Sequence, residues 1–262
     1  MDTNPHQILR WHVAMGADAA VGEEPLGLYR QGGKTKSAPA AAQATPTHSA
    51  AEPTAIPAPK PRLDGRELAQ AAQNLEQWQK AVVAFDGLAI KSTAIQPVFY
   101  DGNPQAKVLL IGEAPGAEED RSGKPFVGPA GQLLDKMLAA IQLDRTQVFI
   151  SNILHWRPPN NRQPTPEEMA LSLPFVHRLI ELTQPKIIVC LGGVALKALF
   201  NAPEGIMKLR GTWRDLTTPG GFTAPTLLTY HPAFLLRTAT AKKDAWADLQ
   251  ALQARLREMV DG

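Results

Sequence analysis

Four short apolar runs, separated by amphipathic stretches, constrain the fold of this chain more than any other feature. The runs read VLLIG (108–112), VFISN (148–152), IIVCLG (187–192) and TLLTYH (226–231). Each run is apolar at consecutive positions, which is the pattern of a strand that helices cover on both faces. Strands alternating with helices therefore predict an α/β fold with a parallel sheet between two layers of helices.

The stretches between the runs predict the helices of those layers. One helix is expected to begin after Asp64, its N-cap, and to run through GRELAQAAQNLEQWQKAVVAF. Another opens at TPEEM, with Thr165 as the N-cap, Pro166 as the first helical residue and Glu168 completing a capping box. Further helices are expected at GQLLDKMLAAIQ, at VALKALF and from about Lys242 to Met259.

Composition divides the chain into three parts. Between Ala38 and Pro61, 15 of 24 residues are Ala or Pro, so this segment has too few large apolar groups to offset its ordering entropy. We expect a short helical appendage over 1–30, a disordered linker over 31–62 and one folded domain over 63–262. A weak helix or a disordered tail is the alternative reading of the appendage.

Charge and hydropathy limit the class of partner. The chain carries 27 basic and 25 acidic residues, a net charge of +2, which neither requires nor excludes nucleic acid because a local basic patch is what binds phosphates. No apolar run approaches the roughly 18 residues of a membrane span, and the N-terminus has no secretory apolar core. We expect a cytoplasmic monomer without a membrane or obligate protein partner, and the partner of the appendage stays open.

The loop GEAPGAEEDRSGKPFVGPAG (Gly112 to Gly131) directly follows the first apolar run. Its spacing fits neither a P-loop nor a dinucleotide fingerprint. Its acidic side chains outnumber Arg121 and Lys124, which disfavours a bare polyphosphate as the ligand. The ligand should be mainly neutral, with hydrogen-bonding edges and an apolar face.

Three side chains near the ends of the runs match such a ligand. In parallel sheets the ligand lies beyond the carboxyl ends of the strands. There Asn152 offers a paired donor and acceptor, His231 a switchable donor and Phe126 a flat apolar face. These are the groups that an extruded nucleobase needs for stacking and for edge recognition.

Five motifs in this order resemble the family-4 uracil-DNA glycosylases, across roughly Phe85 to Met259. They are GEAPGAEEDRSGKPFVGPAG, SNILHWRPPNNR followed by PTPEE, PKIIVCLGGVAL, LRGTW and YHPAFLLR. The resemblance implies a three-layer α/β/α fold with a central four-stranded parallel sheet. It also implies a base-excision-repair enzyme that flips uracil out of DNA and hydrolyses its N-glycosidic bond, leaving an abasic site, with uracil-containing DNA as its partner.

The resemblance also implies roles for individual residues. Phe126 stacks on the base, Asn152 reads its N3 and O4 edge, and His231 donates to O2. Glu113 and Glu119 lie near the sugar and complete the catalytic set. The positions implied to bind substrate are Gly112, Ala114, Gly116, Phe126, Asn161 and Arg210. Ala114 stands where other uracil glycosylases place a water-activating Asp, so the hydrolytic water is expected to be positioned indirectly.

Basic and apolar side chains near the same edge are expected to contact DNA. The set comprises Arg157, Arg162, Arg214, Leu235 and Arg237. In YHPAFLLR, the run from Phe234 to Arg237 offers an apolar wedge that fills the space left by the extruded base. The alternative is that this run begins the last helix and packs inward.

The sequence departs from family 4 at the iron–sulfur cluster. That family holds a [4Fe–4S] cluster through four cysteines, whereas this chain contains only Cys190, which we expect to be a buried core thiol. Motif intervals assign the four ligand positions to Phe85, Leu88, Trp156 and Ser172. We therefore expect no cofactor and no metal, with a hydrophobic plug led by Trp156 in that volume.

Other functions stay open at this point. One is a catalytically weak relative that binds uracil or damaged DNA without cleaving it, and another is a glycosylase with shifted specificity for other deaminated bases. A third, from a different class, is a small-molecule hydrolase or a nucleoside-binding protein. Salt-dependent binding separates this third class, because contacts to several DNA phosphates weaken steeply as salt rises.

Overall fold

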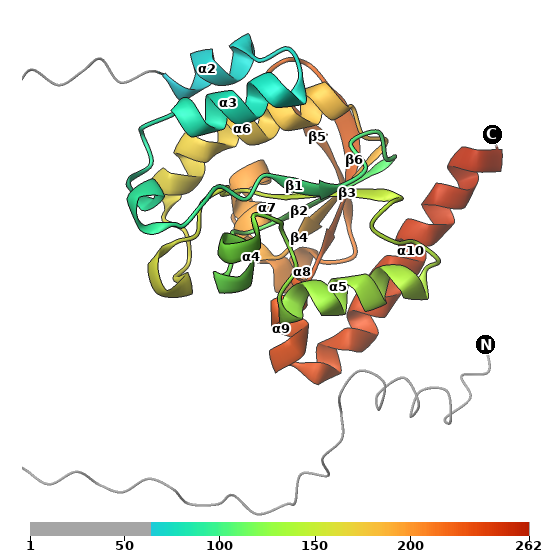
Figure 1. Ribbon diagram of the computed structural model, residues 1–262. Coiled ribbons are helices and arrows are strands. Elements are labelled where there is room, and N and C mark those ends of the chain that lie inside the picture. Colours follow the sequence, from blue (N-terminus) through green and yellow to red (C-terminus); the bar gives the residue numbers. More distant parts are fainter. Residues whose placement is uncertain (1–63, 262) are drawn as a thin grey trace, which may run out of the picture. The chain divides into compact units, whose positions relative to one another are not determined.

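The computed structural model describes residues 64–261, which include all four apolar runs (Figure 1). The helix expected within 1–30 and the linker expected over 31–62 lie outside the described residues. The first described helix, α2 (Gly65–Ala71), begins as predicted, because the Asp64 carboxylate accepts a hydrogen bond from the Arg66 N–H at 2.9 Å.

The central sheet has the strand order β1-β3-β2-β4-β6-β5. The four apolar runs form its parallel centre as β2 (Val108–Gly112), β3 (Val148–Asn152), β4 (Ile187–Leu191) and β6 (Thr223–Thr229). Every residue of β2, β3 and β4 is buried, which explains why those runs are apolar at consecutive positions. The predicted parallel sheet is confirmed.

Two antiparallel edge strands, which the sequence did not predict, bring the sheet in the described residues to six strands. β1 (Tyr100–Gly102) pairs with β3, and β5 (Trp213–Thr217) pairs with β6. β1 has only three residues, and β5 reads WRDLT with a single buried position. Neither strand shows the continuous apolar pattern of a covered strand. The four-stranded prediction is therefore right for the parallel centre and wrong for the edges.

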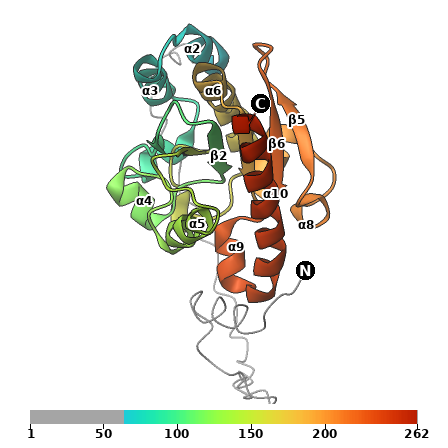
Figure 2. The same ribbon diagram turned by 90° about the vertical axis from the view of Figure 1, so that its right-hand side faces the viewer.

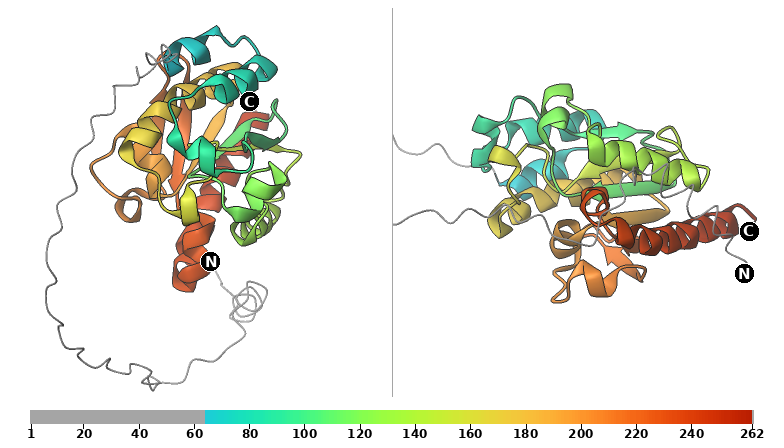
Figure 3. Two further views of the ribbon diagram at one scale, coloured as in Figure 1. Left: turned by 60° about the vertical axis from the view of Figure 1, so that its left-hand side comes forward. Right: turned by 90° about the horizontal axis from the view of Figure 1, so that it is seen from below.

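Helices cover both faces of the sheet, as predicted. α2, α3 (Leu75–Ala84) and α6 (Pro166–Thr183) lie on one side, and α5 (Pro129–Ala140) and α10 (Lys242–Asp261) lie on the other (Figure 1 and Figure 2). Seen from below, α10 in red runs beside α5 in green, and the two helices are in contact (Figure 3). α7 (Gly193–Phe200) packs against α6 and β4.

The helix predicted over residues 65–85 is two helices. α2 ends at Ala71, and α3 begins after Asn74, whose side chain accepts a hydrogen bond from the Gln77 N–H at 2.9 Å. An Asn at the N-cap satisfies one of the free N–H groups at a helix start. The helical spacing of apolar residues continues across this break, and for that reason the periodicity did not reveal it.

Short helices shape the connections that follow the strands. They are α4 (Ala117–Ser122) after β2, α8 (Ile206–Leu209) before β5 and α9 (Pro232–Arg237) after β6, together with the 3₁₀ turns η1 (Ala89–Thr93), η2 (Pro159–Asn161) and η3 (Ala239–Ala241). None of these was predicted, because six or fewer residues are too few to show a helical period. The capping box of α6 is confirmed, with Glu168 N–H donating to Thr165 Oγ1 at 3.2 Å.

Candidate active site

A cavity of about 820 Å³ lies at the carboxyl ends of the parallel strands. The connections after those strands supply its wall: Glu113, Ala114, Gly116 and Phe126 after β2, Asn152, Asn161 and Arg162 after β3, Gly192 and Gly193 after β4, and Tyr230, His231 and Arg237 after β6. This is where ligands bind in parallel α/β sheets. The cavity therefore lies at the sheet edge that the sequence indicated.

Asn152 is the last residue of β3 and lies beside Gly112, its register partner on β2. The N–H groups of Ile153 and Leu154 donate to the carbonyls of Gly112 and Glu113 at 3.0 and 3.1 Å, so the two chains stay paired beyond the strand ends. Asn152 is 2% exposed, and its Oδ1 has no hydrogen-bond partner among the described residues. Because a buried acceptor without a partner is costly, this oxygen indicates a place kept for a ligand donor.

Phe126 approaches the same point from the other side. A Cβ atom on Gly112 would come within 2.5 Å of both the Phe126 ring and Asn152 Oδ1, so only glycine lets the ring and the amide come so close. The Phe126 ring centroid lies 5.4 Å from that of His231, at an interplanar angle of 31°. The structure therefore brings an aromatic face, an amide edge and an imidazole to one cavity.

His231 is the N-cap of α9, and this role decides where its proton sits. Its Nδ1 accepts a hydrogen bond from the Ala233 N–H at 3.1 Å. Burial lowers the pKa of His231 to about 4, and the nearby Arg237 lowers it further while Glu119 opposes the shift. The neutral ring must then carry its hydrogen on Nε2. His231 is thus a neutral hydrogen-bond donor in the cavity wall.

Glu113 and Arg237 both line the cavity, and their charges interact. Burial raises the pKa of the Glu113 carboxyl, and the positive charge of Arg237 acts in the opposite direction. The pair places a carboxylate and a guanidinium beside the neutral imidazole.

Glu119 lines the cavity, and its carboxylate also holds the loop after β2. Its Oε1 accepts from the N–H groups of Val127 and Gly128 at 3.0 and 2.8 Å, and its Oε2 accepts from the Gly116 N–H at 3.1 Å. Although Glu119 touches the cavity wall, three backbone donors occupy its carboxylate. The contacts therefore show Glu119 holding the loop together from within the cavity wall.

The loop after β3 has its own internal network. Asn161 lines the cavity, and its Oδ1 accepts from Arg157 Nε at 2.7 Å. The Arg157 guanidinium also lies 3.7 Å from the buried carboxylate of Asp120 on α4. Arg162 forms two hydrogen bonds to Glu168, at 2.8 and 2.6 Å. Both arginines are therefore tied to this loop, with Arg162 remaining part of the cavity wall.

Three of the residues expected to contact substrate or DNA lie elsewhere. Arg210 pairs with Asp248 of α10, with Nε 3.0 Å from Oδ2, and it does not line the cavity. Arg214 lies within the edge strand β5 rather than in a strand-end loop. Leu235 is 1% exposed, whereas Leu236 is 48% exposed. α9 is a separate short helix that buries Leu235, so the exposed apolar side chain of this run is Leu236.

Comparison with known proteins agrees with this geometry. The sequence profile of the Uracil DNA glycosylase superfamily matches residues 99–250, which include the strands and most of the cavity wall. The chain belongs to the uracil DNA glycosylase superfamily. It is 39% identical over 155 residues to the type-4 uracil-DNA glycosylase of Archaeoglobus fulgidus, an alignment that covers 58% of this chain and 77% of that protein.

Other relatives extend the similarity. The type-4 uracil-DNA glycosylase of Sulfurisphaera tokodaii is 35% identical over 188 residues, covering 69% of this chain and 84% of that protein. The type-5 uracil-DNA glycosylase of Thermus thermophilus is 32% identical over 169 residues, covering 56% and 75%. Type-4 and type-5 proteins are thus both among the relatives of this superfamily member.

The cavity of this superfamily member also contains residues that the sequence analysis missed. They are Met169 on α6, Lys197 on α7, Ile206 and Met207 on α8, and Tyr230 after β6. Lys197 lies about one turn into α7, the helix that directly follows β4. Its position near a strand end could have identified it as a candidate site residue. Met207 is 64% exposed, and α8 was too short to be predicted.

The four positions that the motif intervals assign to the family-4 cluster ligands do not fit an iron–sulfur cluster. Phe85, Leu88 and Trp156 are buried in the hydrophobic core, and Ser172 Oγ donates to the Ile153 carbonyl at 2.7 Å. No thiolate is present among the four, and cluster irons are held by thiolates. Residues 64–261 also contain no group of three or more His, Cys, Asp or Glu side chains arranged to hold a metal ion.

Lys91 links two of these positions. Its Nζ donates to the carbonyls of Val83 and Phe85 at 2.6 and 2.7 Å, and it lies 5.5 Å from the centroid of the Trp156 ring. Phe85 is the C-cap of α3, whereas Trp156 belongs to the loop after β3. The lysine thus connects segments that are far apart in the sequence. Cys190 is buried in β4, and burial raises the pKa of its thiol.

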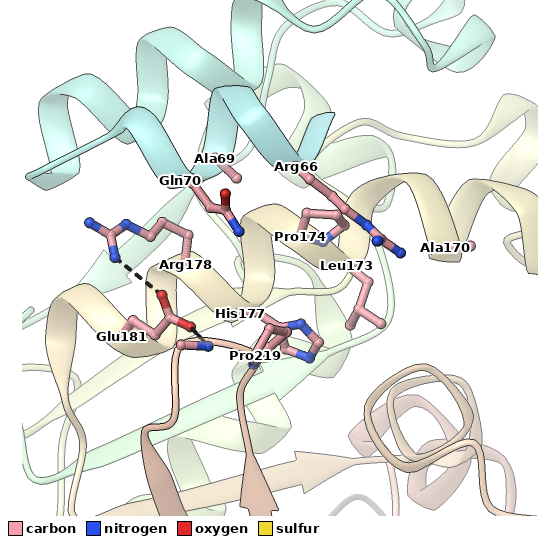
Figure 4. Close-up of a pocket in the computed structure, with 11 residues that line it drawn as sticks. Arg66, Ala69, Gln70, Ala170, Leu173, Pro174, His177, Arg178, Glu181 and Pro219 are labelled. Atoms are coloured by element: carbon pink, nitrogen blue, oxygen red, sulfur yellow. Dashed lines mark hydrogen bonds and ion pairs between the residues drawn. The ribbon is translucent and has the colours of Figure 1, made fainter. Parts of the chain in front are cut away.

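A second hollow, of about 500 Å³, lies between α2, α6 and the β5–β6 turn (Figure 4). None of the residues expected to bind substrate or DNA lines it. Its wall includes Arg178, whose Nη1 lies 3.1 Å from Glu181 Oε2, and Glu181 also accepts from the Gly220 N–H at 2.9 Å (Figure 4). Within the described part of the chain, no helix is long and apolar enough to cross a membrane.

Proposed function

We propose that this protein is a uracil-DNA glycosylase of the type-4 kind that excises uracil from DNA and leaves an abasic site, the first step of base excision repair. The proposal draws on superfamily membership and on the type-4 enzymes among its relatives. The observation that carries it is the buried, unpartnered Oδ1 of Asn152 beside the Phe126 ring.

Asn152 selects the base. Its free Oδ1 accepts the N3–H of uracil, and its amide NH₂ donates to O4. Cytosine has an unprotonated N3 and an amino group at position 4. Its N3 would place an acceptor against Asn152 Oδ1, and its amino group would place a donor against the Asn152 NH₂ group. A site that loses buried hydrogen bonds in this way rejects the wrong base strongly. Phe126 supplies a stacking face, which is worth about 1–3 kcal/mol per base.

His231 stabilises the leaving base. When the bond between C1′ and N1 breaks, its electron pair moves to uracil and negative charge grows on O2, while positive charge grows on the sugar. The Nε2–H of neutral His231 donates to O2, and the Glu113 carboxylate lies in the same cavity wall to offset the sugar charge. Water then supplies hydroxide to C1′ and releases a proton. A preorganised donor of this kind typically contributes about 10²–10³ in rate.

DNA is held by the basic and apolar groups at the cavity. Arg162, Lys197 and Arg237 all line it, and they provide positive charge for backbone phosphates. Leu236 takes the place expected for Leu235 as the apolar wedge, because its side chain is the exposed one. The resulting surface suits a DNA strand with one base turned into the cavity.

We further propose that this enzyme works without a cofactor. The proposal is supported by Phe85, Leu88 and Trp156, which stand at the expected ligand positions and are buried in the hydrophobic core, with Lys91 bridging the two segments. In this proposal, packing and one partly buried cation replace a metal-mediated link between α3 and the loop after β3. No step of the proposed chemistry runs through iron.

Alkali-revealed strand cleavage tests the function. A labelled oligonucleotide with one uracil is incubated with the protein, with Asn152→Ala, with His231→Ala and with the control Asn103→Ala, whose side chain serves a turn remote from the cavity. We expect uracil release by the wild type and the control, and a loss of about 10²-fold or more in the two cavity variants. Salt-sensitive binding of the uracil strand without release would instead indicate a recognition protein.

A further inference from the structure

Phe126 occupies a backbone conformation that an aromatic residue rarely adopts. Its φ is +56°, in the left-handed region, where a bulky side chain is strained. Such a residue persists only where the surrounding structure holds it firmly, and strain of this kind concentrates at binding and catalytic sites. The residues that hold Phe126 are therefore part of the machinery that presents its ring.

The backbone around Phe126 is held from two directions. On the N–H side, Glu119 accepts from the N–H groups of Val127 and Gly128 at 3.0 and 2.8 Å. On the carbonyl side, Arg145 Nη2 donates to the Phe126 carbonyl, and its Nη1 donates to the Pro125 carbonyl at 3.3 Å. The two residues thus hold the peptide group between Phe126 and Val127 from both sides, Arg145 at its carbonyl and Glu119 at its N–H.

The fit around the Phe126 carbonyl is close. A Cβ atom on Gly131 would lie 1.6 Å from that oxygen, so glycine at this position lets the carbonyl reach its place. Arg145 approaches it from the loop between α5 and β3. The carbonyl has no freedom to turn while both neighbours are present.

Arg145 is itself held rigidly. Its Nη1 lies 2.8 Å from Asp101 Oδ2 and its Nε lies 2.7 Å from Asp135 Oδ1. Its side chain is 24% exposed, and Asp101 is 21% exposed. A guanidinium with two carboxylates on one side and two carbonyls on the other uses its planar fork fully, which a lysine cannot imitate. Arg145 does not line the cavity.

We infer that Arg145 is a positioning residue: it locks the strained backbone of Phe126 so that the ring presents its face to an extruded pyrimidine base. The identity of the base in this inference rests on the proposed function. The contact between Arg145 and the Phe126 carbonyl is independent of that function. Arg145 acts through Phe126 alone and touches neither base nor DNA in the cavity.

The first test measures the contact directly, by amide hydrogen exchange of the segment 125–131 in the whole protein. Arg145→Met should exchange faster in this segment than the wild type. Arg178→Met is the matched control, because Arg178 is 21% exposed, donates to the Ala72 carbonyl at 2.8 Å and pairs with Glu181 away from the cavity (Figure 4). Unchanged exchange in 125–131 would overturn the inference.

The second test measures the consequence, as kcat/KM on an oligonucleotide with one uracil. Loss of correct positioning should reduce kcat/KM about 10-fold or more in Arg145→Met and leave Arg178→Met near wild type. In a Phe126→Ala background, Arg145→Met should add little further loss, because its effect passes through that ring. Multiplicative losses would assign Arg145 a role independent of Phe126 and overturn the inference.

Arg145→Lys covers the case in which Arg145→Met does not fold. It keeps the charge beside Asp101 and Asp135 but cannot grip both carbonyls, so the same faster exchange and a smaller loss of kcat/KM are expected. If the wild type itself releases no uracil, the proposed function fails, while the exchange experiment still decides whether Arg145 holds the segment. Faster exchange with unchanged kcat/KM in an active wild-type background would overturn the positioning role.

Discussion

Among the described residues, burial lowers the pKa of three imidazoles, His155, His177 and His231, and their ionisation links folding to pH. The pKa of His155 is lowered from 6.5 to about 3, and that of His231 is lowered to about 4, in both cases chiefly by burial. His155 packs edge-on against Trp78, with ring centroids 5.0 Å apart, and its Nε2 has no partner among the described residues. Between pH 6.5 and about 4, the unfolded chain binds protons that the folded protein does not.

This sign means that the free energy of unfolding falls as the pH drops below about 6.5. His155→Phe removes one of these groups, so we expect the acid-side slope to decrease by up to about 1.4 kcal/mol per pH unit. Denaturant unfolding of both proteins at pH 7, 6 and 5 measures the slopes. Parallel slopes would show that His155 is protonated in the folded protein or solvated in both states.

At the scale of elements, the plug joins α3 to the loop that carries Asn161. The joint consists of buried aromatic packing and of Lys91, whose charge reaches two carbonyls at the end of α3 and the face of Trp156. Cations near a helix C-terminus are favourable because the last carbonyls lack helical partners. The joint couples the stability of α3 to the loop after β3.

Lys91→Met keeps the aliphatic length of the side chain and removes its charge. We expect a loss of about 1–3 kcal/mol in the free energy of unfolding, because hydrogen bonds to charged groups are among the stronger ones. Lys80→Met is the control, since Lys80 is 72% exposed and pairs only with Glu76 one turn away. Trp156→Cys should also lower the melting temperature and bind no iron. If Lys91→Met and Trp156→Cys lowered the stability no more than the control Lys80→Met does, the stabilising role of the hydrophobic plug would be contradicted.

At the scale of the whole molecule, a net charge of +2 predicts little general attraction to DNA. Arg162, Lys197 and Arg237 nevertheless gather at the cavity. Binding to uracil-containing DNA should therefore weaken with salt, with a slope of about −0.9 in log K against log salt for each phosphate contacted. Arg237→Gln should reduce the magnitude of that slope by about 1, whereas Lys80→Gln should not. A slope near zero would point to a small-molecule site.

The sequence was most informative where a pattern repeats along the chain. Consecutive apolar residues predicted β2, β3, β4 and β6, because a strand covered on both faces is mostly apolar on both of its faces. The carboxyl ends of those strands then indicated where Asn152 and His231 meet. β1 and β5 were missed because edge strands are short or half exposed and lack that pattern.

The amino-acid sequence by itself determined the parallel sheet, its helical covering and the edge at which the site lies. Only the tertiary structure decided the direction of individual side chains. It turned Leu235 inward and Leu236 outward, engaged Glu119 with three backbone donors and brought Arg145 to the Phe126 carbonyl. The burial of a residue can be predicted from the periodicity of its own segment. These contacts join segments that are distant in the sequence, and no local pattern shows that such segments are close in space.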